Sequence, residues 1–338
     1  MEKNAFDPIK LYAALAIMVM HYTGYQLIAS DNMHGPVYAL RCISRLFTPL
    51  MLFFSISGFL CAGSCDRYAS FLEYLKRRIF RLYPHLWICT LVMLITVPFL
   101  GCPEFLSLQN LYKYLPAQFI GVAYTPKCFK PYGTGSINGT LWTVMVQFQL
   151  FILAKLIFKW LKKLSVISWT VLLVMLAFIN ILCRYLADRY TGLFAKSIER
   201  SFLPYAIWFF IGVFCNLFFE RIIPVLKKIW PLLAAASIIS TMGIIPDYGY
   251  YEGILISVSC PFLAIAAGYI LPPVRFKEDI SLELFLYHWI VLNFFVQFGI
   301  MEKVSPILSF LMFMVIGIAF SCVMHILSKK MIKLWRDR

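Results

Sequence analysis

Lys10 and His21 lie eleven residues apart in the first apolar segment, and their spacing is that of a functional pair. Eleven steps of 100° come to roughly 1100°, about 20° past three turns, so a helix places both side chains on one face, separated by about 16 Å. An imidazole within a membrane segment is costly to bury and is therefore a candidate for proton transfer or nucleophilic catalysis. A structural histidine satisfied by a neighbouring helix explains the position equally well.

A second group of cations follows the second apolar segment, in YLKRRIFRLYPHLW. Arg78 and Arg81 are three residues apart and share a helix face, and Arg77 flanks them. These residues could fix the topology or bind anionic lipid headgroups, worth about 1 kcal/mol per charge. Arginine also suits bidentate recognition of phosphate. Because Lys10 is predicted at the same depth, docking of a phosphorylated cofactor is an equal interpretation.

Polar and aromatic side chains recur in the later apolar segments. Hydroxyl and amide groups in hydrocarbon need partners inside the bundle, so they either join helices or line a pocket. In the apolar segment near residues 280–299, Glu283 and Tyr287 share a helix face, whereas His288 is turned by about 100° from Tyr287. The candidates for substrate contact or support of the site are Ser57, Asn138, Trp142, Gln147, Glu283, Tyr287 and His288.

The composition is that of a polytopic membrane protein. Hydrophobic residues make up 61% of the 338 residues, charged residues only 14%, and the mean hydropathy is +0.79. The long apolar runs exclude a transmembrane β-barrel, whose strands alternate over about ten residues. We predict an all-α helical bundle that forms a single domain over residues 1–338. Ten segments are long enough to cross a membrane, near residues 8–28, 43–63, 80–100, 139–158, 164–186, 202–219, 226–244, 251–271, 280–299 and 305–328.

The net charge of +15 does not indicate a nucleic-acid partner, because the basic residues lie in short connections between the apolar segments. With a cytoplasmic N-terminus, about 21 of the 31 Lys and Arg residues fall on the cytoplasmic side, as the positive-inside rule requires. Both termini are then cytoplasmic. The basic segment 184–200 is the exception, a predicted outer loop or an interfacial helix.

The ten cysteines are scattered singly and form no C-x-x-C pair, so we expect no metal site. Cys102 and Cys128 both fall in the predicted outer loop between the third and fourth segments. They could form a disulfide in an oxidising compartment. The loop is rich in Tyr, Phe, Pro and Gly, and its aromatic content predicts an ordered structure.

Five stretches in this order resemble the bacterial acyltransferase-3 family of membrane-bound O-acyltransferases, which modify surface glycans. They are FDPIKLYAALAIMVMH, TPLMLFFSISGFL, YLKRRIFRLYPHLW, GTLWTVMVQFQLF and ISLELFLYHWIVL. Each stretch alone is weakly specific, but together they extend over almost the entire chain. The resemblance implies a location in the bacterial inner membrane and a standalone form without an SGNH domain.

The resemblance also implies roles for particular residues. The family carries an arginine, ten residues and then a histidine in its first helix, and this chain has Lys10 and His21 at those positions. The histidine is implicated in acyl transfer, and Arg78 and Arg81 correspond to arginines that bind the phosphates of acyl-CoA. The family usually has a glutamate where this chain has Gln147, which removes an acid or base from that position.

Together the residues and the resemblance predict transfer of an acyl group from cytoplasmic acyl-CoA to a sugar hydroxyl. The resemblance alone implies that the acyl group is acetyl. The pantetheine arm would reach from the cations toward His21, which acts as general base or carries the acyl group. The acceptor would be an envelope polysaccharide or its lipid-linked precursor. A transporter or flippase of a glycan or small solute is the main alternative, because intramembrane polar residues can also line a pathway. A non-catalytic assembly partner is a second alternative.

Overall fold

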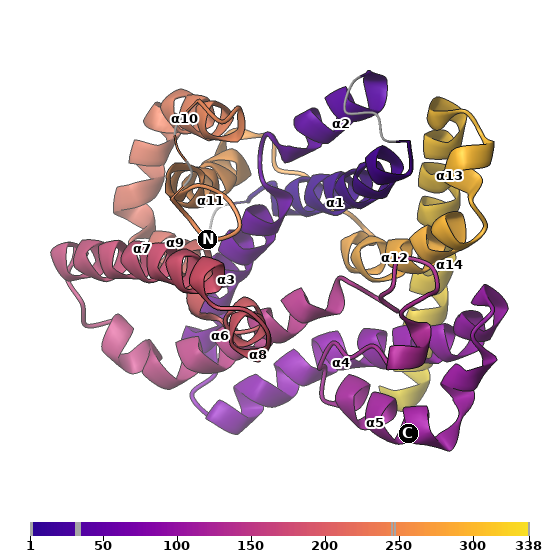
Figure 1. Cartoon of the computed structure of the whole chain (residues 1–338). Coiled ribbons are helices and arrows are strands. Elements are labelled where there is room, and N and C mark those ends of the chain that lie inside the picture. The colour runs from indigo at the N-terminus through magenta and orange to yellow at the C-terminus, as the bar shows by residue number, and fades with distance from the viewer. Residues whose placement is uncertain (1–2, 31–34, 245, 247, 337–338) are drawn as a thin grey trace. The chain divides into compact units, whose positions relative to one another are not determined.

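The structure, a computed structural model, describes residues 3–30, 35–244, 246 and 248–336, and these residues form α-helices and short 3-10 helices without any strand (Figure 1). The predicted all-α fold is therefore confirmed. Local sequence sets several helix ends. Pro49 begins α3, where its fixed φ suits the first turn, and the Ser165 hydroxyl accepts a hydrogen bond from the backbone N–H of Ser168 at the start of α7.

Each of the ten predicted segments coincides with a helix. These helices are α1 (Phe6–Ser30), α3 (Pro49–Arg67), α4 (Phe71–Thr96), α6 (Leu141–Leu161), α7 (Val166–Arg189), α9 (Ala206–Leu217), α10 (Phe219–Thr241), α11 (Ile254–Ile270), α12 (Ser281–Gln297) and α14 (Pro306–Arg336). In the described ranges, 8 helical segments are long and apolar enough to cross a membrane. The helices α11 and α12 have 17 residues each, the short end of the range for a span. The number of ten spans remains a prediction.

Shorter helices fill the connections: α2 (Pro36–Arg45), α5 (Leu108–Phe119), α8 (Leu193–Glu199), α13 (Ile300–Lys303), η1 (Val97–Leu100), η2 (Pro103–Leu106), η3 (Lys127–Phe129) and η4 (Leu203–Tyr205). The aromatic connection after the third segment is ordered around α5, as expected. Of the two interpretations of 184–200, the structure contradicts the loop and agrees with a helix, because α7 continues to Arg189 and α8 follows almost at once.

The chain forms two compact units, each assembled from separate stretches of sequence. Unit 1 comprises Met1–Ala13, Arg45–Leu75 and Val146–Lys277, and unit 2 comprises Ala14–Ser44, Lys76–Met145 and Glu278–Arg338. Helix α1 contributes its first two turns to unit 1 and the rest, including His21, to unit 2. Unit 2 therefore contains the histidine, whereas unit 1 contains Lys10.

Two glycines allow α3 and α9 to approach closely in unit 1. A Cβ atom at Gly58 would collide with the carbonyl oxygen of Phe209, and one at Gly212 would collide with the carbonyl oxygen of Ser55. The two backbones are thus in direct contact. Small residues at a crossing point are the usual means of packing helices in a membrane, where lipid provides no hydrophobic drive for association.

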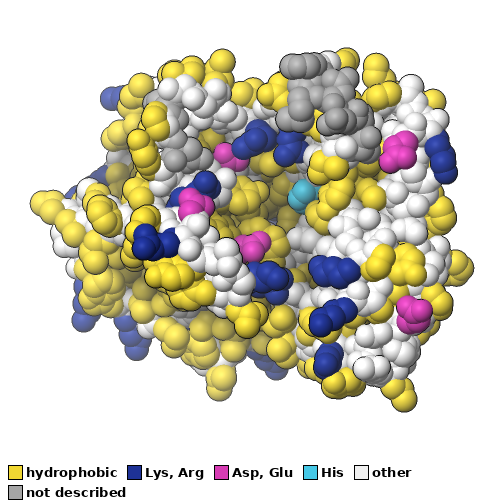
Figure 2. Space-filling view, viewed as in Figure 1, with side chains coloured by type: hydrophobic (Ala, Val, Ile, Leu, Met, Phe, Trp, Pro, Cys, Tyr) yellow, Lys and Arg dark blue, Asp and Glu magenta, His cyan; other side chains and the backbone are white. Residues whose placement is uncertain are grey.

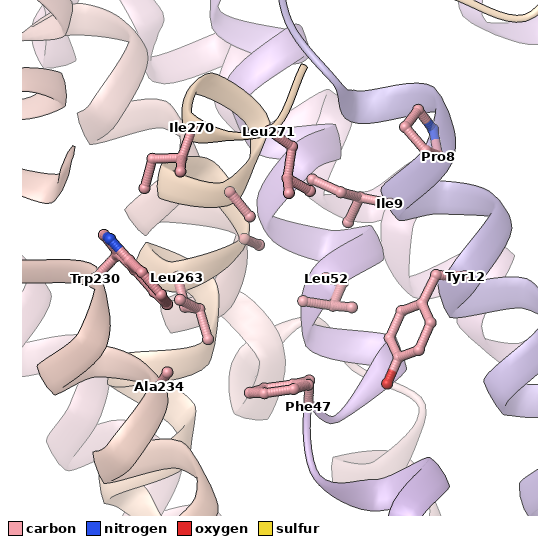
Figure 3. Close-up of a pocket in the computed structure, with 12 residues that line it drawn as sticks. Pro8, Ile9, Tyr12, Phe47, Leu52, Trp230, Ala234, Leu263, Ile270 and Leu271 are labelled. Atoms are coloured by element: carbon pink, nitrogen blue, oxygen red, sulfur yellow. The ribbon is translucent and has the colours of Figure 1, made fainter. Parts of the chain in front are cut away.

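Unit 1 also contains an apolar pocket of about 360 Å³ between α1, α3, α10 and α11. Figure 3 shows Tyr12 of α1 and Trp230 of α10 on facing walls, with the aliphatic Leu52 and Leu263 between them. The lining contains no Lys, Arg, His, Asp or Glu residue. This pocket therefore offers neither an acid, a base nor a phosphate ligand, and it is not the candidate reaction site.

The surface of the described residues is strongly hydrophobic. Yellow side chains make up most of the face shown in Figure 2, with basic and acidic side chains between them. On α7, for example, Ile167 is 78% exposed and Phe178 is 73% exposed. Large apolar side chains in such positions are suited to contact with lipid hydrocarbon, and the chain is a multi-pass membrane protein.

Candidate functional site

A pair of histidines in unit 2 is the chemically distinctive feature of the structure. Nδ1 of His21 on α1 lies 2.8 Å from Nε2 of His288 on α12. The two ring planes differ by 13° and the centroids are 5.1 Å apart, so the rings meet end to end along the hydrogen bond. His288 is fully buried. The structure thus brings together two residues that the sequence analysis placed on separate segments.

The hydrogen bonds assign the tautomers of both rings. Nδ1 of His288 lies 2.7 Å from the carbonyl oxygen of Leu284, which can only accept a hydrogen bond, so this nitrogen carries the proton. With both rings neutral, Nε2 of His288 has a lone pair and accepts the N–H of Nδ1 of His21. Nε2 of His21 is consequently left with a lone pair. This nitrogen can take a proton from a hydroxyl group or attack a carbonyl carbon.

Trp289 holds the ring of His21 from a second side. Its indole ring packs edge-to-face on His21, with centroids 4.7 Å apart and an interplanar angle of 80°. The indole N–H donates to Oγ1 of Thr134 at 3.0 Å and to the carbonyl of Ser136 at 3.1 Å. A Cβ atom at Gly139 would overlap the indole ring, so glycine there makes room for it. The sequence analysis did not include Trp289 among the site residues, although it follows His288 directly.

The glycine-rich segment before α6 anchors this arrangement. Oδ1 of Asn293 accepts hydrogen bonds from the backbone N–H of Thr134 at 2.9 Å and from its hydroxyl at 2.8 Å. The phenol of Tyr25 donates to the carbonyl of Thr134 at 3.4 Å. Gly133 and Gly135 have φ values of +52° and +72°, a region that glycine enters without strain. The segment is therefore fixed to both α1 and α12.

Asn138 has a structural position at the start of α6. Its side-chain N–H donates to the carbonyl of Leu286 at 2.8 Å, and its Oδ1 accepts from the backbone N–H and the hydroxyl of Thr140. Trp142 is half-buried one turn later. Asn138 thus ties the beginning of α6 to the helix that carries His288.

Glu283 contacts two other histidines. Its Oε1 lies 2.9 Å from Nδ1 of His85 on α4 and 3.2 Å from Nδ1 of His325 on α14, and the carboxyl group is 1% exposed. His325 also contacts Glu278 at 2.8 Å, and the hydrogen bonds from His325 and Lys329 lower the pKa of Glu278 to about 2. The sequence analysis missed His85 and His325. His85 follows Arg81 by four residues, and this helical spacing could have revealed it.

The remaining predicted residues have separate surroundings. The ring of Tyr287 packs on Phe320 of α14, with centroids 5.7 Å apart. In unit 1, the side-chain N–H of Gln147 donates to the hydroxyl of Ser57 at 2.6 Å and so joins α6 to α3. Lys10 forms an ion pair with Asp7 at 2.9 Å on the same helix.

The three arginines singled out by the sequence lie on α4 in unit 2, and their role in binding phosphate stays a prediction. On α4, Arg78 is 8% exposed, whereas Arg77 and Arg81 are exposed.

Cys102 and Cys128 are free thiols, and Sγ of Cys102 lies 3.6 Å from the carbonyl oxygen of Cys128. Burial raises the pKa of the Cys102 thiol to about 11, which reduces the thiolate fraction at neutral pH. The disulfide that the sequence allowed is therefore not formed in the structure. Within the described residues, no cluster of His, Cys, Asp or Glu could hold a metal ion.

Comparison with known proteins places this arrangement in a family. A family model described as "Acyltransferase domain", that of acyltransferase-3, matches residues 3–326. The chain is 23% identical over 335 residues to Nodulation protein 10 of Rhizobium leguminosarum bv. viciae, covering 88% of this chain and 85% of that protein. It is also 23% identical over 297 residues to the O-acetyl transferase of Shigella phage Sf6, covering 85% of this chain and 84% of that protein. No solved structure matches the chain. The chain therefore belongs to the acyltransferase-3 family and is a membrane-bound O-acyltransferase.

Proposed function

We propose that the protein transfers an acetyl group from cytoplasmic acetyl-CoA to a sugar hydroxyl of a cell-surface polysaccharide or of its lipid-linked precursor. The observation that carries this proposal is the hydrogen-bonded chain from Leu284 through His288 to His21, which leaves Nε2 of His21 as a base. The name of the phage relative, an O-acetyl transferase, supports acetyl as the acyl group.

In the simplest mechanism His21 acts as a general base. Nε2 takes the proton of the acceptor hydroxyl as its oxygen attacks the carbonyl carbon of the thioester. When the C–S bond breaks, the sulfur of CoA receives that proton, so the enzyme ends in its starting state. His288 keeps His21 in the reactive tautomer and shares the positive charge that develops on the imidazole, the role that a carboxylate has in serine hydrolases.

The alternative is a covalent route in which Nε2 of His21 attacks the thioester carbon and the C–S bond breaks, releasing CoA as the thiolate. The acylated ring would pass its Nδ1 proton to Nε2 of His288. The acceptor oxygen would then attack the acetyl carbon, the bond to Nε2 would break, Nδ1 would take its proton back, and the proton of the acceptor hydroxyl would end on the CoA sulfur. Both routes use the same tautomer, and trapping of a labelled acetyl group on the protein would distinguish them.

The donor requires cations for its phosphate groups, and the arginines of α4 supply them. Arg78 and Arg81 share a face of α4, and guanidinium groups match phosphate oxygens in a bidentate geometry. Lys10 is the third phosphate ligand in this proposal, and Arg77 flanks the cluster. We place these cations on the cytoplasmic side of the bacterial inner membrane, as the distribution of Lys and Arg between the connections indicates.

The proposal is tested with purified protein, radiolabelled acetyl-CoA and envelope material from the parent bacterium after deletion of this gene. The unmodified protein is expected to label the glycan, and His21→Ala is expected to lower the rate by at least about 100-fold, the usual contribution of a general base. Cys42→Ala, an exposed position on α2, is the control and keeps full activity. Undiminished transfer by His21→Ala would contradict the mechanism, and glycan export without labelling would favour a transporter.

A further inference from the structure

The apolar pocket of unit 1 opens at the surface of the described residues. Tyr12, Trp230 and Leu271 line it, and each of them is between 41% and 47% exposed. Alanines on α10 and α11 form part of its wall, and their small side chains create the volume of about 360 Å³. Sites for small ligands have volumes of about 300–1000 Å³. The pocket is therefore large enough for a ligand, and its lining selects a hydrocarbon group.

The two ends of this pocket are formed by different parts of the helices (Figure 3). Pro8 and Ile9 of α1 lie at one end together with Leu271, the residue that follows α11. Phe47 and Ala234 lie at the opposite end. The first end is thus where α1 begins and α11 finishes. The chain segments that leave these helices determine the charge around it.

Basic residues flank this first end. The backbone N–H of Phe276, in the segment after α11, donates a hydrogen bond to Oδ2 of Asp7 at 3.2 Å. Asp7 directly precedes Pro8, so this bond holds the neighbours of Phe276, which are Arg275 and Lys277, beside the pocket. Both of these residues are exposed. We refer to Arg275 and Lys277 as the cationic end of the pocket.

The acidic residues next to the cationic end are engaged with other cations. Asp7 forms an ion pair with Lys10 at 2.9 Å. Glu278, which follows Lys277 in the sequence, accepts a hydrogen bond from Nζ of Lys329 at 2.6 Å. Each carboxylate is thus balanced by a partner of its own, and the cationic end contributes positive charge beside an apolar pocket.

We propose that this pocket binds an anionic phospholipid of the surrounding bilayer, with one acyl chain in the pocket and the phosphate group at the cationic end. A phospholipid carries its negative charge next to a long hydrocarbon chain, and the site has the complementary order of charge and apolar surface. Basic pockets between membrane helices recognise lipid headgroups, and each Lys or Arg near the headgroup is worth about fivefold in affinity. The site contains neither His21 nor the arginines of α4, so the inference goes beyond the proposed function.

The first test measures binding of brominated phosphatidylglycerol to the purified protein in detergent micelles. Bromine atoms on the acyl chain quench indole fluorescence on contact, and the difference between the unmodified protein and Trp230→Phe isolates the signal of Trp230. We expect saturable quenching, with half-saturation at a mole fraction at least about tenfold lower than for brominated phosphatidylcholine, whose headgroup has no net charge. Equal quenching by both lipids, or quenching that does not saturate, would overturn the proposal.

The second test fills the pocket. Ala234→Phe on α10 is expected to raise the half-saturating mole fraction of phosphatidylglycerol by about tenfold or more, because the new ring displaces several methylene groups of the acyl chain. The matched control is Ala235→Phe at the next position, which is exposed and is not among the described lining residues. The control should change the half-saturating mole fraction by less than about twofold. Equal effects of the two variants would contradict an acyl chain in the pocket.

The third test removes the cationic end and leaves the pocket wall intact. Arg275→Gln combined with Lys277→Gln should weaken binding of phosphatidylglycerol by roughly 10- to 25-fold and leave binding of phosphatidylcholine unchanged. The control is Lys159→Gln combined with Lys163→Gln, two exposed positions at the end of α6, which contributes no described residue to the pocket. Because all four side chains are exposed, this comparison holds even if Ala234→Phe fails to fold. The same loss in both double variants would refute the proposed headgroup site.

Competition then identifies the class of ligand. Displacement of brominated phosphatidylglycerol by a polyprenyl phosphate at a lower mole fraction than by unlabelled phosphatidylglycerol would assign the pocket to an isoprenoid carrier. Displacement by coenzyme A would assign the cationic end to the acyl donor. Either result would overturn the proposal. If phosphatidylglycerol binds as expected but His21→Ala transfers acetyl groups at the full rate, the lipid site stands and only the proposed mechanism fails.

Discussion

At the scale of single residues, the hydrogen bonds of His288 set the tautomer of His21, and in the proposed mechanism that tautomer decides which nitrogen reacts. The carbonyl of Leu284 fixes the proton on Nδ1 of His288, and Nε2 of His288 in turn fixes the proton on Nδ1 of His21. A neutral imidazole without this partner would exchange between two tautomers, and only one of them has its lone pair on Nε2. The free energy that orients the base thus comes from one backbone carbonyl, a turn away on the same helix as His288.

Replacing His288 should therefore reduce turnover without weakening substrate binding. We expect His288→Ala to lower turnover by roughly 10- to 100-fold, within the range for general-base catalysis, and to leave the Michaelis constants nearly unchanged. His288→Gln should retain more activity, because its amide oxygen can accept the N–H of His21. Steady-state kinetics with labelled acetyl-CoA decide the matter. Equal loss in both variants would show that the ring of His288 has only a packing role.

The sequence predicted individual residues better than their pairings. His21 could be found from its depth in an apolar segment and from its distance to Lys10, because both follow from local helical geometry. Its bond to His288 could not, since the two residues are separated by 267 positions and meet only through packing of α1 against α12. Glu283 was grouped with Tyr287 on periodicity, but its contacts with His85 and His325 depend on two further helices.

At the scale of elements, the crossing of α3 and α9 depends on Gly58 and Gly212. Both helices were predicted from their hydropathy, and Ser57 on α3 was predicted either to join helices or to line a pocket. Which helix would fill that role was not predictable, because hydropathy does not encode partner choice. The failure at 184–200 has a different cause. Its charged residues suggested a loop, yet all of them except Arg200 lie on the last turns of α7 or on α8.

Gly212→Ala is expected to destabilise unit 1, since its methyl group would collide with the backbone of α3. Overpacking of a well-packed contact costs about 1–3 kcal/mol, which should appear as a lower midpoint of thermal unfolding in detergent. Ser64→Ala on α3 is the control, because that hydroxyl donates to the carbonyl of Leu60 in its own helix. Two variants of equal stability would mean that the backbones can separate without cost.

At the scale of the whole molecule, the distribution of charge predicts its orientation in the membrane. The predicted cytoplasmic connections contain most of the Lys and Arg residues, whereas 184–200 is a basic segment assigned to the outer side. The all-α class, the ten apolar segments and the family followed from composition and from the order of the sequence blocks. The side of the membrane on which each connection lies is predicted from the charge bias alone.

Cysteine labelling in intact cells tests this orientation. In a Cys42→Ala background, which removes an exposed native thiol, Leu193→Cys on α8 should react with a membrane-impermeant maleimide added from outside. Leu193 is 85% exposed, so its reactivity reports the side of the membrane and not burial. Lys76→Cys on α4 should react only after the cells are permeabilised. Labelling of both positions only after permeabilisation would reverse the assignment of α8.

The wide separation of His21 and His288 along the chain also has a consequence for biogenesis. The ribosome makes α1 among the first residues, but α12 begins only after the 250 residues between Ser30 and Ser281 have been synthesised. Thr134 and Ser136 likewise wait for Asn293 and Trp289 before their hydrogen bonds can form. A nascent or prematurely terminated chain therefore holds His21 without its partner. In the proposed mechanism the base becomes competent only when α12, in about the last sixth of the polypeptide, has been inserted, so synthesis itself would set the time at which acyl transfer can begin.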